Sequence, residues 1–171
     1  NNAGMSGDRR NQAWGQIDQN EFTKLISINA FGALKVAEAF SKNIANSEGK
    51  KIVAISSVAG SISSMGRPSS LPILSISKAA LNMAMKTVAL RLKDEGVTVI
   101  LINPGAVDTR ALRQAFGLSL EEAEKATNFD YKGYPTVSPE EGVRRMIDVI
   151  ENADQSQNGS FLNHDGKELP W

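Results

Sequence analysis

Two short stretches of the chain are apolar at almost every position and rich in β-branched residues. They are residues 52–55 (IVAI) and residues 97–102 (VTVILI). Unbroken apolar runs of this length are typical of parallel strands that are covered on both faces. A third run, at residues 159–163 (GSFLN), predicts a last strand near the end of the chain. The pattern therefore predicts about three parallel strands.

Other segments carry apolar residues at helical spacing. They cover residues 19–44, residues 76–93 and the stretch after residue 138. Asp18 and Glu21 form a D-x-x-E start for the first helix, and Ser75 can cap the second. Asn29 falls within the apolar stripe of the first helix, where a polar side chain needs partners. Residues 5–17 predict a loop over the strand ends, with Trp14 packed on the domain.

Polar side chains follow the first strand directly, as Ser56 and Ser57. In an open α/β sheet the ligand crevice lies beyond the carboxyl ends of the strands, which makes this turn a candidate for chemistry. The alternative is that both serines only satisfy backbone groups of the turn. Lys78 follows in the first turn of the second helix, an unfavourable end of the helix dipole for a cation.

Five motifs join these elements. They are N-N-A-G at residues 1–4, S-I-N-A-F-G around Asn29, S-S-V-A-G followed by S-I-S-K-A-A-L, N-P-G at residues 103–105 and the ending F-L-N-H-D-G-K-E-L-P-W. Together they resemble the short-chain dehydrogenase/reductase family. The ending is similar to that of the C-factor and carbonyl-reductase-like branch. The resemblance implies the carboxyl-terminal part of a Rossmann-like, doubly wound parallel sheet. Residues 1–171 would form one such domain without the family's first half, completed by oligomerisation.

The resemblance also implies roles for particular residues. Ser57, Lys78 and Asn29 match the family's catalytic positions, although Asn29 could equally be a core amide bonded to backbone. Positions expected to contact a nicotinamide cofactor are Asn2, Gly4, Gly105, Val107 and Thr109. The alternative for Thr109 is a simple helix cap.

Leu74 departs from the family pattern, because the catalytic tyrosine of Y-x-x-x-K stands at this position in the family. The family's glycine-rich, pyrophosphate-binding turn also precedes N-N-A-G, so we expect no cofactor for this chain unless NADP or NAD binds without that turn. Residues 110–137 resemble a substrate lid. Tyr131 and Tyr134 lie there and are candidate replacement proton donors.

The composition of the chain argues against several classes of binding partner. Nineteen basic and nineteen acidic residues give no net charge, which argues against a nucleic acid or a membrane as partner. The absence of cysteine fits a cytoplasmic protein, and His164, the only histidine, predicts no metal site. The family's helix pairing implies a homo-oligomer, such as a dimer, that acts on a small molecule.

Three functions follow. The first is a non-redox, cofactor-independent isomerisation, dehydration or cyclisation of a small hydroxy or carbonyl metabolite, which Leu74 favours. The second is the carboxyl-terminal portion of an NAD(P)-dependent carbonyl reductase. The third is a non-catalytic, dimerising scaffold or signalling protein.

Overall fold

Three parallel strands form the centre of the molecule in the computed structural model, which describes residues 1–126 and 129–171. They are β1 (Lys51–Ile55), β2 (Thr98–Asn103) and β3 (Phe161–Asn163), in the order β1-β2-β3. The predicted α/β class with a Rossmann-like parallel sheet is confirmed. The last strand begins two residues later than predicted, because Gly159 adopts a positive φ of 79° and turns the chain into the sheet.

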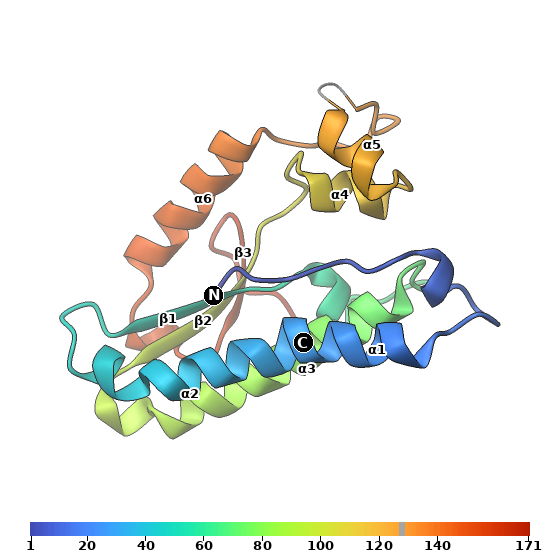
Figure 1. Cartoon of the computed structure of the whole chain (residues 1–171). Coiled ribbons are helices and arrows are strands. Elements are labelled where there is room, and N and C mark those ends of the chain that lie inside the picture. The colour runs from blue at the N-terminus through green and yellow to red at the C-terminus, as the bar shows by residue number, and fades with distance from the viewer. Residues whose placement is uncertain (127–128) are drawn as a thin grey trace.

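The side chains of β2 alternate between two apolar layers. Val99 and Leu101 pack with the helices on one face, whereas Ile100 and Ile102 pack with Val149 on the other. All six residues of β2 are buried. Figure 1 shows the two layers, with α1, α2 and α3 on one side of the sheet and α6 on the other. The unbroken apolar run predicted this double coverage correctly.

The first helical segment differs from the single helix predicted over residues 19–44. It consists of α1 (Gln19–Ile26), a π-helical turn (Ser27–Phe31) and α2 (Gly32–Ala45). Asp18 caps α1 as predicted, since its side chain accepts a hydrogen bond of 2.7 Å from the Glu21 amide. Asn29 lies in the π turn, and π turns often occur at functional sites.

Helix α3 (Pro72–Arg91) begins four residues before the predicted start. Pro72 takes the first helical position, where its missing N–H costs nothing, and Ser75 lies inside the helix rather than capping it. The side chain of Gln12, which is fully buried, accepts from the Leu74 amide at 2.9 Å. A distant residue therefore satisfies one of the free amides of the first turn. Although α3 is long and apolar enough to cross a membrane, it packs on β2 and α2, as a core helix does.

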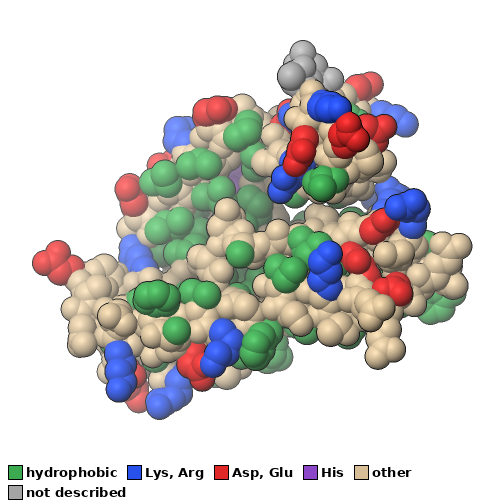
Figure 2. Space-filling view, viewed as in Figure 1, with side chains coloured by type: hydrophobic (Ala, Val, Ile, Leu, Met, Phe, Trp, Pro, Cys, Tyr) green, Lys and Arg blue, Asp and Glu red, His purple; other side chains and the backbone are tan. Residues whose placement is uncertain are grey.

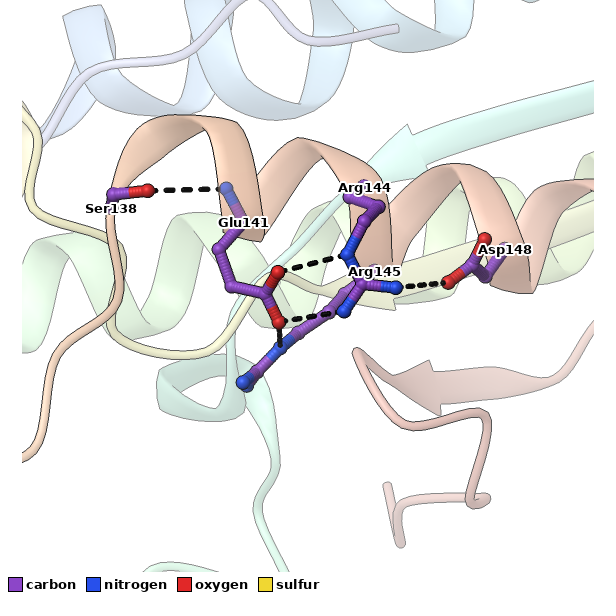
Figure 3. Close-up of polar contacts among 5 residues, drawn as sticks. All are labelled: Ser138, Glu141, Arg144, Arg145 and Asp148. Carbon is purple, nitrogen blue, oxygen red and sulfur yellow. Dashed lines mark hydrogen bonds and ion pairs between the residues drawn. The ribbon is translucent and has the colours of Figure 1, made fainter.

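Helix α6 (Pro139–Asn152) covers the other face of the sheet. Ser138 caps it by accepting from the Glu141 amide at 3.2 Å. Figure 3 shows the Glu141 carboxylate between Arg144 and Arg145, with Arg144 reaching on to Asp148. The two arginines lower the pKa of Glu141 to about 2. These pairs lie on the solvent side of the helix and support it only weakly.

Short elements complete the chain. They are the helices α4 (Arg110–Ala115) and α5 (Leu120–Lys125) and the 3₁₀ turns Arg10–Gln12, Val58–Gly60, Lys93–Glu95 and Gln155–Gln157. Trp14 is 97% exposed, so the prediction that it packs on the domain is wrong. It lies just beyond the 3₁₀ turn, in a stretch tied by the backbone bonds from Gln16 to Ala13 and from Asp18 to Asn11.

Apolar side chains remain exposed on both helical layers. Figure 2 shows hydrophobic groups gathered over α6, where Val143 and Ile147 are exposed. On the other side, Phe31, Phe40 and Met83 project from the helices. Completion of the domain by oligomerisation is consistent with these surfaces and stays a prediction.

Candidate active site

Lys78 is held at the carboxyl end of β1. Its Nζ donates to the Ile55 carbonyl oxygen at 2.9 Å, and Gly60 packs against its backbone so closely that a Cβ there would lie 2.7 Å from the Lys78 carbonyl carbon. Burial lowers the pKa of Lys78 to about 8. The ammonium group can therefore exchange a proton near neutral pH, which an ordinary surface lysine cannot.

Asn29 lies beside this ammonium group and is completely buried. Its Oδ1 accepts from the Met5 amide at 2.8 Å, and its Nδ2 donates to the Met5 carbonyl and to Ser77 Oγ, both at 2.9 Å. Gly4 lies next to both side chains. A Cβ added at this position would be 3.4 Å from Asn29 Oδ1 and 3.6 Å from Lys78 Nζ. The structure thus brings together Asn29, Lys78 and Gly4 from three separate motifs.

Ser57 lies two residues beyond Ile55, at the same strand end. Its Oγ accepts from the Ala59 amide at 3.2 Å and so starts the 3₁₀ turn. The next amide, that of Val58, donates to Asn103 Oδ1 at 3.1 Å. Both bonds fix the turn and leave the hydroxyl proton of Ser57 able to donate to a ligand.

Leu74 is half-buried one turn before Lys78 on α3. The side chain contains no exchangeable proton. The helix holds position 74 firmly, since its amide is bound to Gln12. The chain therefore differs from the family at position 74 in the side chain alone. The helical backbone that carries the tyrosine in the family is present here.

The remaining expected cofactor positions lie after β2 and at the start of the chain. Gly105 has a φ of 74° and packs on His164, whose Cδ2 would lie 2.5 Å from a Cβ. Val107 pairs with Val137, and Thr109 caps α4 by accepting from the Leu112 amide at 3.4 Å. Asn2 is exposed in the segment that begins alongside β1, where the Ile55 amide donates to the Asn1 carbonyl.

The two tyrosines of the segment predicted to be a lid have different surroundings. Tyr131 is buried against Phe116, and its hydroxyl donates to Asp108, which also accepts from Arg113 Nε at 2.7 Å. Burial first and the bond to Asp108 second raise the pKa of Tyr131 to about 12. This hydroxyl is a poor acid in this structure. Tyr134 is exposed and stacks obliquely on Phe116.

Several supporting residues were not recognised from the sequence. Gln12 ties the loop to α3, Ser77 accepts from Asn29, and Asn82 accepts from Ser56 Oγ at 2.5 Å. Ser77 could have been suspected, because it directly precedes Lys78 in the motif. Gln12 and Asn82 carry no motif, and only their complete or near-complete burial reveals them.

A profile of the short chain dehydrogenase family matches residues 1–117, which include all three of the grouped motifs. The chain belongs to this family. A Schizosaccharomyces pombe protein named as an uncharacterized oxidoreductase is 36% identical over 143 residues, which are 84% of this chain and 55% of that protein. A short chain dehydrogenase of Penicillium aethiopicum is 34% identical over 175 residues, covering 99% of this chain and 65% of its own.

A shorter relative matches over most of its own length. The C-signal protein of Myxococcus xanthus is 28% identical over 175 residues, covering all of this chain and 90% of that one. Among solved structures, NADPH-bound carbonyl reductase from chicken fatty liver superposes with a TM-score of 0.75 at 23% identity, covering 92% of this chain and 60% of its own. This last likeness shows the fold alone.

The chain spans between about half and two thirds of the oxidoreductases named above. The relatives make this an oxidoreductase-like protein of the family. They favour the oxidoreductase alternative over the cofactor-independent reaction that Leu74 suggested, for which they provide no support.

Proposed function

We propose that the chain provides the reaction-side part of a nicotinamide-dependent oxidoreductase that interconverts a small carbonyl compound and its alcohol. The observation that carries the proposal is the position of Lys78. Its ammonium group is bound to the Ile55 carbonyl, partly shielded from water and placed beside Asn29 and Gly4. Burying a charged lysine in this way lowers the stability of the folded protein. Such a lysine is therefore expected where function requires it.

The residues of this strand end fit a nicotinamide nucleoside. Among the residues that the structure describes, the Ile55 carbonyl is the one recorded acceptor for Lys78 Nζ, so two N–H groups are left for ribose hydroxyls. Gly4 leaves room next to them, since a Cβ at this position would lie 3.6 Å from Lys78 Nζ. Thr109 and the backbone at Gly105 and Val107 would contact the carboxamide. The residues that would hold the pyrophosphate precede the family's N-N-A-G motif.

A bound nicotinamide dinucleotide would supply or accept the hydride. Ser57 would donate a hydrogen bond to the carbonyl oxygen, keeping its proton, and so stabilise the charge that develops there. Lys78, with its pKa near 8, would supply through a water molecule the one proton that this oxygen gains, because Leu74 has no proton to give. Asn29 keeps the Met5 backbone and Ser77 in place around this path.

The test is to restore a proton donor at position 74. Supplied with the glycine-rich first half of a family member, the Leu74→Tyr variant should oxidise NADPH with an aromatic aldehyde about 100-fold faster than the unaltered chain in the same pairing. Leu74→Phe is the matched control, since it adds the ring without the hydroxyl and should give no gain. NADPH binding is followed alongside by nicotinamide fluorescence. If a folded Leu74→Tyr chain paired in this way neither binds NADPH nor oxidises it, the oxidoreductase proposal is wrong.

A signalling role is the second candidate, because the C-signal protein shares 90% of its length with this chain. Such a role predicts self-association without a reaction. Dimerisation through α2 and α3, whose exposed side chains include Phe31, Phe40 and Met83, is compatible with either function.

A further inference from the structure

A hollow of about 660 Å³ is lined by residues that directly follow Ser57 and Leu74 in the chain. Val58 and Ala59, which directly follow Ser57, line one part of it, and Ser75, which directly follows Leu74, lines another. Most of the remaining wall is the loop between the 3₁₀ turn and α3.

The lining carries unbalanced positive charge. It includes Arg9 and Arg67 and no acidic side chain. Five of the eight arginines pair with carboxylates, namely Arg10, Arg110, Arg113, Arg144 and Arg145. Of the three without a carboxylate within 4.0 Å in the described part of the chain, two line this hollow and the third is Arg91. Because the whole chain has no net charge, the hollow differs from the average surface.

The two arginines come from different segments. Arg67 belongs to the loop that follows Ser57, whereas Arg9 belongs to the loop after N-N-A-G, and its Nη1 donates to the Ala115 carbonyl at the end of α4 at 3.4 Å. Hydroxyl groups of Ser64 and Ser70 stand between apolar parts of the wall, which include Met65. Guanidinium and hydroxyl donors bind oxyanions, and the apolar wall suits a hydrocarbon body.

We propose that the hollow binds an oxyanion, a carboxylate or a phosphate, carried by the substrate on an apolar body beyond its carbonyl group. The inference rests on the proposed function, because it places the reacting carbonyl at Ser57. Arg9 and Arg67 would act as specificity-determining residues, and they have no part in the chemical step.

Binding of two probes tests the inference separately from the reaction. The probes are 4-carboxybenzaldehyde and its uncharged methyl ester, titrated calorimetrically into the purified chain. We expect the acid to bind at least fivefold more tightly than the ester. Arg67→Gln and Arg9→Gln should each weaken binding of the acid about fivefold and leave the ester unchanged. Arg91→Gln, which removes an unpaired arginine elsewhere, should change neither.

The outcomes separate the two proposals. Arginine-dependent binding of the acid without NADPH oxidation would support this inference and contradict the proposed function. If the Leu74→Tyr chain oxidises NADPH at equal rates with the acid and the ester, the proposed function is supported and this inference is contradicted. Equal affinity for both probes, an equal loss in Arg91→Gln, or no binding of the acid at millimolar concentrations would overturn the inference.

Discussion

Replacing Lys78 by methionine should stabilise the protein near neutral pH. A lysine titrates near 10.5 when solvated, and burial lowers the pKa of Lys78 to about 8. At pH 7 Lys78 is protonated in both the folded and the unfolded protein. The full free energy of burying the charged form therefore lowers the stability of the folded protein. With about 1.4 kcal/mol for each pKa unit, that cost is about 3 kcal/mol.

The sign follows from the direction of the shift. Between pH 8 and pH 10.5 the unfolded chain binds more protons at this site than the folded chain, so raising the pH stabilises the wild type. The methionine variant has no such site and does not gain. Loss of the bond to the Ile55 carbonyl removes about 1 kcal/mol from the variant. The expected net gain is therefore about 2 kcal/mol at pH 7, falling to about zero at pH 10.

Urea unfolding of both proteins at pH 7 and pH 10, followed by circular dichroism, measures this difference. Lys86→Met is the matched control, because Lys86 also lies on α3 and donates to a carbonyl, that of Gly159, at 3.0 Å. That variant should lose about 1 kcal/mol at both pH values. If the Lys78→Met protein is less stable than wild type at pH 7, the buried ammonium group does not destabilise the folded protein. The central argument for the site would then fail.

Two other substitutions probe the surroundings of the site. Gly60→Ala should destabilise the chain by about 2 kcal/mol in urea unfolding, because its Cβ would lie 2.7 Å from the Lys78 backbone, while Gly49→Ala, with open space around it, should change little. Tyr131→Phe should cost about 1 kcal/mol, since the hydroxyl bond to Asp108 is lost, and should leave NADPH oxidation by the Leu74→Tyr chain unchanged. A tenfold loss of that oxidation at unaltered stability would instead identify Tyr131 as a proton donor.

Sequence patterns predicted those elements that depend on neighbouring residues. The apolar runs located β1 and β2 to within a residue, because β2 is buried on both faces and β1 is buried at alternate residues and partly buried at the others. Asp18 was recognised as a cap, since its partner amide lies three residues ahead. The family motifs likewise placed Asn29 and Lys78 together, although no local pattern relates residues 49 positions apart.

Long-range partners explain the errors. The sequence predicted Ser75 as the N-cap of α3, yet the helix starts at Pro72. The Gln12 side chain, 62 positions before Leu74, accepts a hydrogen bond from the Leu74 amide in the first turn of the helix. The apolar stripe over residues 19–44 did not reveal a π turn, because the bonds of Asn29 come from Met5 and Ser77, outside that helix. Nor could the sequence show that Asp108 accepts the hydroxyl of Tyr131.

The π turn at Ser27–Phe31 holds one residue more than a regular α-helix would use for the same advance around the axis. Deleting one residue between positions 27 and 31 would let the segment close into an unbroken α-helix. Helices α1 and α2 would keep about the same relative orientation, with Glu21 and Leu25 still facing the core. The change would fall on the turn itself, where Asn29 bonds to Met5 and Ser77. A single residue of chain length therefore decides how Asn29 is presented to Lys78, while the helices on either side are left in register.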